Sequence, residues 1–209
     1  MLQRSRVFDR LLLATGNRHK YGEFLELLPS WAMKNLIFAQ DLPDVTAFVP
    51  EVEETGSTYV MNALLKAMAW SAAFGLPCLA DDSGLEVEAL GWEPGVRSAR
   101  VSDGDRLLSS DAERNQWLLS CMENKTNRRA RFVAAIVLYV PEEWALACEG
   151  TCDGRLSTRE AGALGFGYDP LFVPDGYDVS FGELPSPVKN RISHRAAAMT
   201  ALSDILSGV

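Results

Sequence analysis

The sequence predicts an α/β fold with a mixed sheet, and three observations lead to this prediction. A short apolar strand at 10–14 passes through a small polar turn into a helix. A helix at 58–74 precedes a second buried strand that begins at Cys78. The β-branched and aromatic run at 131–140 is followed by a turn and a further run at 144–151, which is typical of an antiparallel hairpin. Helices that alternate with strands early, and a hairpin late, favour a mixed sheet.

Apolar spacing and terminal signals define the elements of the first half. The first helix has apolar residues at helical spacing before a closing proline: Tyr21, Phe24, Leu25, Leu28 and Pro29. The second helix is expected to present an apolar face made of Val60, Leu64, Ala67 and Ser71. Asn62 and Lys66 are expected on another face of the same helix. Gly75 is expected to end it. The strand that begins at Cys78 is expected to end in the polar residues 81–84.

The second half contains fewer clear signals. Residues 91–100 form a loop rich in glycine, proline and arginine, and residues 110–123 have a helical pattern. A loop punctuated by Gly162, Gly165 and Gly167 leads to 168–170. Ser193 can cap a final helix, whose expected apolar side is Ala197, Ala201 or Leu202, and Ile205.

Length and composition predict one globular domain over 1–209, with 1–10 as an N-terminal extension. The chain is 47% hydrophobic and 23% charged, which is ordinary for globular proteins. Its net charge of −8 argues against a non-specific nucleic-acid partner. Apolar runs are too short for a membrane helix or a secretory signal, and the four cysteines match no common zinc spacing. We therefore expect a cytoplasmic protein with reduced thiols and no membrane partner.

Three segments carry candidate chemistry, and the first is the turn at 15–20. It is small and polar and opens a helix, where free backbone N–H groups suit a phosphate, and Lys20 adds a charge. A simple connecting turn is the alternative, and no Walker loop occurs anywhere in the sequence.

The second segment is Asp81-Asp82, together with Glu53 and Glu54 in an acidic connection over 41–57. Neighbouring carboxylates repel one another unless a cation or a shared proton relieves them, and Mg²⁺ is commonly held by carboxylates and substrate phosphates. A spare carboxylate can deprotonate water. The alternatives are a capping aspartate and a solvated acidic face.

The third segment, 186–195, contains four basic residues and no acid: Lys189, Arg191, His194 and Arg195. This local positive region at a helix start favours an anion, although a basic surface stretch is the alternative. The glycines at 162–167 have the wrong spacing for a dinucleotide fingerprint. Phe166 and Tyr168 can stack on a ligand base or belong to the core.

Seven motifs in order resemble the inosine triphosphate pyrophosphatase family over about 11–206: TGNRHK (15–20), EETG (53–56), NALLKA (62–67), ADDSGL (80–85), PGVRSAR (94–100), GFGYDPLF (165–172) and ISHRAAA (192–198). The resemblance implies an elongated α/β fold with two lobes, a mixed, curved central sheet and a cleft between the lobes, usually as a homodimer. It implies hydrolysis of ITP, dITP and XTP to the monophosphate and pyrophosphate with Mg²⁺ or Mn²⁺.

The resemblance also assigns roles to residues. Asp82 would be the general base and a metal ligand, with Glu53 as a second metal ligand. The residues that would hold the triphosphate are Thr15, Gly16, Asn17, Arg18, His19 and Lys20. Those that would contact the rest of the substrate are Ser83, Phe166, Gly167, Tyr168, Asp169, Lys189, His194 and Arg195. Supporting residues would be Glu54, Lys66 and Asp81.

One departure from the family pattern concerns the metal. The family's helix usually reads glutamate-Asn-Ala, whereas this chain has Met61-Asn62-Ala63. Two other functions remain open at this point: a nucleotide sensor without turnover, and a pyrophosphatase that prefers pyrimidine nucleotides.

Overall fold

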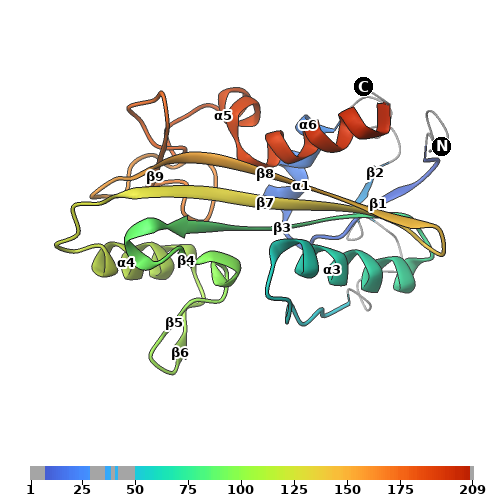
Figure 1. The fold of residues 1–209 in the computed structure, drawn as a ribbon, viewed down its shortest axis with the longest axis horizontal. Coiled ribbons are helices and arrows are strands. Elements are labelled where there is room, and N and C mark those ends of the chain that lie inside the picture. Colours follow the sequence, from blue (N-terminus) through green and yellow to red (C-terminus); the bar gives the residue numbers. More distant parts are fainter. Residues whose placement is uncertain (1–7, 29–35, 39–40, 42–49, 208–209) are drawn as a thin grey trace. The chain divides into compact units, whose positions relative to one another are not determined.

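The computed structural model describes residues 8–28, 36–38, 41 and 50–207 (Figure 1). Most of the expected N-terminal extension, Pro29 and part of the acidic connection lie outside these residues. The described chain divides into two compact units. The first unit takes in residues up to Asp82, 134–150 and those from Arg195 onward; the second takes in 83–133 and 151–194.

The first unit is a sheet covered by helices on both faces. Its strands occur in the order β2-β1-β3-β7-β8, and β1 (Leu11–Leu13) is parallel to both β2 (Leu36–Phe38) and β3 (Cys78–Val87). The other two strands are β7 (Arg129–Val140) and β8 (Trp144–Leu156). The helix α3 (Tyr59–Phe74) lies on one face, and α6 (His194–Ser207) lies on the opposite face, together with α1 (Arg18–Leu27) (Figure 1).

Side chains alternate between the two faces of this sheet, as strand geometry requires. Leu13, Leu79 and Ile136 pack in one cluster with residues of α1 and α6. Their neighbours in the chain pack in a second cluster with residues of α3; these are Leu12, Ala14, Cys78, Ala80 and Val137. In the first part of β3, odd positions therefore face α1 and α6, and even positions face α3.

Local capping explains where the helices begin and end. The Asn17 side chain accepts hydrogen bonds from the backbone N–H groups of His19 and Lys20, and Thr58 accepts one from Met61 at the start of α3. Gly75 ends α3 with a φ of 64°, as expected for a left-handed cap.

The predicted helix faces need correction. The buried residues of α3 are Tyr59, Asn62, Ala63, Ala67, Trp70 and Ser71, whereas Val60 and Leu64 are only partly buried. In α6 the buried residues include Ala198, Met199 and Leu202, whereas Ala197 and Ile205 are exposed. Ala67, Ser71 and Leu202 are buried as predicted. In both helices, however, tertiary packing turns the buried face away from part of the predicted apolar spacing.

The second unit contains shorter elements around its own core. The strand β4 (Glu93–Pro94) is antiparallel to the end of β3, and β9 (Phe172–Pro174) is antiparallel to the end of β8. A small hairpin joins β5 (Ser102–Asp103) to β6 (Arg106–Leu107), and the helices are α4 (Asp111–Cys121) and α5 (Ser186–Ile192). The core of this unit is rich in aromatic rings: Phe132, Tyr168, Phe172 and Phe181.

The expected end of the strand at Ala80 was wrong. β3 continues through Asp81, Asp82 and Ser83 to Val87. A run of three polar residues resembles a turn in sequence, but Asp81 and Asp82 find their partners on opposite faces of the sheet. The candidate carboxylates therefore lie in the middle of a strand.

The four cysteines agree with the expectation of unpaired thiols. All four cysteines are free, and three of them are buried: Cys78, Cys148 and Cys152. Burial raises the pKa of Cys152 to about 12, and two nearby aspartates add to this effect. In the described part of the chain, no helix has the length and apolarity needed to cross a membrane.

Candidate active site

Asp81 and Asp82 are neighbours in sequence but belong to two different clusters, because successive residues of a strand point to opposite faces. Asp81 follows the odd positions of β3 and contacts residues of α1 and α6. Asp82 follows the even positions and contacts residues of α3. Both contact sets lie within the first unit.

Asp81 is the centre of a buried ion network. Its Oδ1 lies 3.2 Å from the Nζ of Lys20, and its Oδ2 accepts a hydrogen bond from the Nε of Arg195 at 3.1 Å. The Nη1 of Arg195 also lies 3.0 Å from Glu23. The side chains of Asp81 and Arg195 are only 1% and 4% exposed, so this network is largely shielded from water.

The charge balance of this network keeps Asp81 ionised. Burial alone would raise the pKa of Asp81, but the charges of Lys20, Arg195 and Lys66 outweigh it and lower that pKa well below its ordinary range. Burial lowers the pKa of Lys20, against the attraction of Asp81, and the two other cations add to that lowering. Both pKa values are thus lowered, which favours the ionised form of Asp81 but not the ionised form of Lys20. Asp81 is therefore anionic in this network, because Arg195 carries a permanent positive charge next to it.

Asp82 is held by two residues one turn apart on α3. Its Oδ2 accepts a hydrogen bond from the Nδ2 of Asn62 at 3.1 Å, and its Oδ1 lies 3.2 Å from the Nζ of Lys66. Lys66 also pairs with Glu54 at 2.9 Å. The result is a cation between two carboxylates at the edge of α3. An ionised carboxylate with fixed orientation is suited to accept a proton from water.

The amide of Asn62 connects the acidic segment to Asp82. Its Oδ1 accepts a hydrogen bond from the backbone N–H of Gly56 at 2.8 Å, which leaves its Nδ2 to donate to Asp82. A Cβ at position 56 would lie 2.6 Å from that oxygen, so only glycine permits this approach. Asn62 is fully buried. Sequence reasoning gave it no role, although an asparagine shortly after the acidic connection was the available signal.

The turn at 15–20 is joined to the carboxylates through its last residue. Thr15 is buried and its Oγ1 accepts a hydrogen bond from the N–H of Asn17, whereas positions 16–19 are exposed. Arg18 pairs with Asp41 at 3.3 Å and lies over the ring of Phe38. Lys20, the last residue of the turn, lies 3.2 Å from Asp81 and pairs with it.

Two predicted metal ligands, Asp82 and Glu53, offer carboxylate oxygens, which are the ligands that Mg²⁺ prefers. Glu53 is exposed and Asp82 is already engaged by Asn62 and Lys66. Among the described residues, no group of three or more His, Cys, Asp and Glu residues could hold a metal ion. Mg²⁺ usually keeps several waters and takes only one or two carboxylates together with substrate phosphates. The donor set therefore fits an ion that binds together with a polyphosphate.

The predicted base-binding residues of the second unit form a rigid loop at 165–169. The Asp169 carboxylate accepts a hydrogen bond from the N–H of Phe166 at 2.8 Å and pairs with Lys189 at 2.6 Å. Gly165 has a φ of 76°, and a Cβ there would collide with the Asp169 carboxylate. The ammonium of Lys189 lies 5.1 Å from the centre of the Phe166 ring.

Three predicted contact residues are more deeply buried than a ligand-facing role would suggest: Tyr168, His194 and Arg195. Tyr168 is 5% exposed and donates its hydroxyl to the carbonyl of Ser98 at 2.9 Å, and burial raises its pKa. The ring of His194 stacks on Phe132 at a centroid distance of 4.7 Å. Arg195 is engaged by two carboxylates, which favours a positioning role over direct contact with a base. Ser83 is half-buried on β3, and Gly167 is held by α4.

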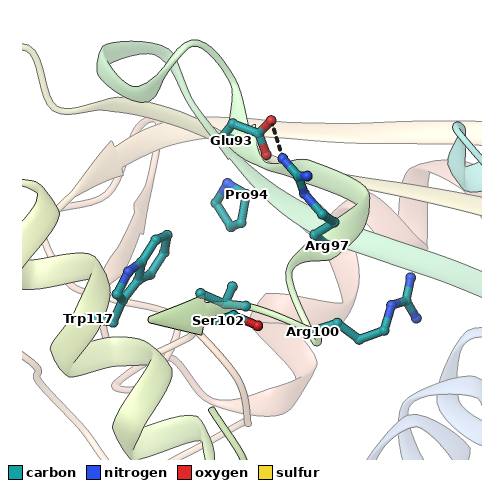
Figure 2. A pocket seen from close by; sticks show the side chains of 7 residues that line it. Glu93, Pro94, Arg97, Arg100, Ser102 and Trp117 are labelled. Carbon is teal, nitrogen blue, oxygen red and sulfur yellow. Dashed lines mark hydrogen bonds and ion pairs between the residues drawn. The ribbon is translucent and has the colours of Figure 1, made fainter. Parts of the chain in front are cut away.

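A separate pocket lies in the second unit, and none of the predicted site residues lines it. Its volume is about 350 Å³, and Figure 2 shows Trp117 facing Pro94, Arg97 and Ser102 across it. Arg97 is paired with Glu93 at 2.6 Å. The pocket uses part of the PGVRSAR motif, for which the sequence supplied no chemical role.

Comparison with known proteins yields one consistent family. The model of the Ham1 family matches residues 11–205. A protein of Deinococcus radiodurans named dITP/XTP pyrophosphatase is 45% identical over 95% of this chain and 94% of its own length. A protein of the same name from Aquifex aeolicus is 42% identical over 94% of this chain and 96% of its own. The solved structure of a HAM1 protein from Coxiella burnetii is 37% identical, with a TM-score of 0.80 over 96% of this chain and 99% of its own.

Proposed function

This chain belongs to the Ham1 family, and from that premise we propose that it hydrolyses the non-canonical purine nucleotides dITP, ITP and XTP to the monophosphate and pyrophosphate. Two relatives that match almost the whole chain at more than 40% identity are named dITP/XTP pyrophosphatases. The observation that carries the proposal within this chain is the Asp82 carboxylate, fixed by Asn62 and Lys66.

In the proposed reaction Asp82 is the general base. It removes a proton from a water molecule, whose oxygen forms a bond to the α-phosphorus. The bond from that phosphorus to the bridging oxygen breaks, and pyrophosphate leaves with the electron pair. The Nζ of Lys66 lies 3.2 Å from Asp82 and helps to fix the orientation of its carboxylate. A positioned base of this kind contributes about 10²–10⁴-fold to rate.

Asp82 and Glu53 are the residues proposed to hold Mg²⁺, or Mn²⁺ in its place. When bound, the ion supplies Lewis-acid polarisation and charge neutralisation on the phosphates. The turn at 15–20 is proposed to bind the triphosphate, with Lys20 and the N-terminus of α1 as its positive groups. Asp81, Glu23 and Arg195 then serve to fix Lys20 rather than to touch substrate.

The loop at 165–169 and its neighbours are proposed to contact the base and sugar. Hypoxanthine and xanthine present an acceptor at position 6, whereas adenine presents an amino donor. A cationic donor such as the ammonium of Lys189 would be left unpaired opposite the amino group of adenine, and each buried unpaired group costs about 1–3 kcal/mol. This mismatch would favour dITP and XTP over ATP.

A pyrophosphate-release assay tests the proposal. With Mg²⁺ present, we expect dITP, ITP and XTP to give kcat/KM values at least about tenfold above those of ATP, GTP and the pyrimidine triphosphates. Binding of dITP without release of pyrophosphate, with either Mg²⁺ or Mn²⁺, would indicate a sensor. A preference for pyrimidine nucleotides would instead replace the substrate class. Chelation of the metal should abolish turnover, and added Mg²⁺ should restore it.

Three further properties belong to the same proposal: a cytoplasmic location, a homodimeric state and the absence of a nucleic-acid partner. The net charge of −8 supports the last of these, because it opposes association with a polyanion. Light scattering coupled to size exclusion measures the dimer directly. A mass of one chain at micromolar concentration would contradict the dimer without affecting the proposed reaction.

A further inference from the structure

The helix α4 holds Gly167 through both of its backbone polar groups. Asp111 Oδ2 accepts a hydrogen bond from the Gly167 N–H at 2.7 Å, and Asn115 Nδ2 donates one to the Gly167 carbonyl at 3.1 Å. Asp111 and Asn115 are four residues apart, so they lie on the same face of the helix. Gly167 has a φ of 63°. These contacts all lie within the second unit.

The start of α4 is braced independently of the loop. Ser110 and Glu113 form a reciprocal capping box, and Glu113 pairs with Arg106 at 2.7 Å. Arg114 pairs with Asp111 and donates a hydrogen bond to the carbonyl of Leu108 at 3.0 Å. The two residues that hold Gly167 are therefore attached to a fixed helix end.

The chemistry of Asn115 indicates that its contact with the loop matters more than its contribution to stability. The side chain is buried, and its Nδ2 also donates to Glu160 at 3.2 Å. Its Oδ1 accepts no hydrogen bond from the described residues. An unsatisfied buried acceptor costs about 1–3 kcal/mol, which offsets what the two Nδ2 hydrogen bonds contribute to stability.

Phe166 is fixed from both sides as a result. Its own N–H donates to Asp169, which is paired with Lys189, and the next residue is held by α4. The Phe166 ring is half-buried, whereas Tyr168 is buried in the core. We infer that Asp111 and Asn115 are positioning residues that set the place of Phe166 for the nucleotide base. This inference rests on the proposed function, in which the loop at 165–169 contacts the base.

Steady-state kinetics with dITP and dATP test the inference. Asn115→Leu and Asp111→Ala are each expected to raise KM for dITP about tenfold or more while kcat changes less than about threefold, because base binding is lost in ground and transition states alike. The dITP to dATP ratio of kcat/KM should fall by a similar factor. Asp111→Asn keeps an oxygen that can accept from the Gly167 N–H, and it should restore KM to within about threefold of wild type.

Glu113→Ala is the matched control, because it removes the capping box from the same helix end without touching Gly167. It should lower Tm and leave KM and the dITP to dATP ratio unchanged. An Asn115→Leu variant that folds with unchanged KM would overturn the inference. If that variant does not fold, equal KM values for wild type and Asp111→Ala would overturn it. Absence of pyrophosphate release by the wild type would instead overturn the proposed function.

Discussion

At the scale of single residues, the same substitution at two adjacent positions should affect different properties, catalytic rate at one and stability at the other. Asp82→Asn removes the proposed base, so kcat should fall at least about 10²-fold. Stability should change little, because Lys66 keeps its pair with Glu54. Asp81→Asn leaves Lys20 and Arg195 without their shared carboxylate and should lower the free energy of unfolding by about 3–5 kcal/mol. Urea unfolding and the pyrophosphate assay measure the two effects.

An Asp82→Asn variant that keeps more than about a tenth of the wild-type rate would remove Asp82 from the role of base. An Asp81→Asn variant with wild-type stability would show that the buried network contributes little to the fold.

The network also predicts how stability depends on pH. The pKa of Asp81 is lower in the folded state than its ordinary unfolded value of about 3.9. Its contribution is therefore fully present above about pH 4 and is lost as the pH falls through the folded pKa. The difference in unfolding free energy between wild type and Asp81→Asn should be constant from about pH 7 to 5 and shrink below about pH 4. Urea titrations at several pH values measure it; a difference that shrinks above pH 5 would contradict the assignment.

At the scale of elements, the start of α3 offers a test of the missing carboxylate. Thr58 is the N-cap and Met61 is the third helical residue, so Met61→Glu would complete a capping box. Met61 is 49% exposed and has room for the change. We expect Met61→Glu to stabilise the protein by about 0.5–1 kcal/mol and to lower the Mg²⁺ concentration that gives half-maximal rate.

Met61→Gln is the matched control for this prediction. Glutamine also completes the capping box, so its gain in Tm should be similar, but it adds no charge for a metal. Equal Mg²⁺ dependence for both variants would place position 61 away from the metal.

The elements also show what sequence could and could not predict. The ends of α1, α3 and α4 depend on local caps at Asn17, Thr58 and Ser110, and local signals are visible in sequence. The three-residue strand β9 depends on the long strand β8 beside it, and β2 depends on its pairing with β1. The length of β3 was missed because its polar centre is stabilised by partners far along the chain.

The candidate site divides in the same way. The motifs predicted three segments that are each contiguous in sequence: the pair Asp81-Asp82, the turn at 15–20 and the basic segment at 186–195. They did not predict that Asp81 binds Arg195, which is 114 residues away, or that Asn62 orients Asp82. Those contacts follow from strand alternation once β3 is known to continue past Ala80.

At the scale of the whole molecule, three strands contribute residues to both units: β3, β7 and β8. Each of these strands runs without interruption from one unit into the other, so unfolding of one unit alone would have to stop in the middle of three strands. We therefore expect one cooperative unfolding transition. Hydrogen exchange in mild urea, measured separately on peptides covering α3 and α4, should give equal opening free energies within about 1 kcal/mol for their slowest amides. Two distinct values would show that the units unfold independently.

The alternation of β3 bears on how genetic variants of this protein should be judged. A screen that measures only how much protein accumulates in cells would detect loss of Asp81, since a few kcal/mol of destabilisation changes abundance severalfold. It would pass Asp82→Asn as harmless, although that variant lacks the proposed general base. Two identical adjacent residues thus carry different risks: substitution of Asp81 is expected to deplete the protein, and substitution of Asp82 is expected to leave an abundant but inactive protein.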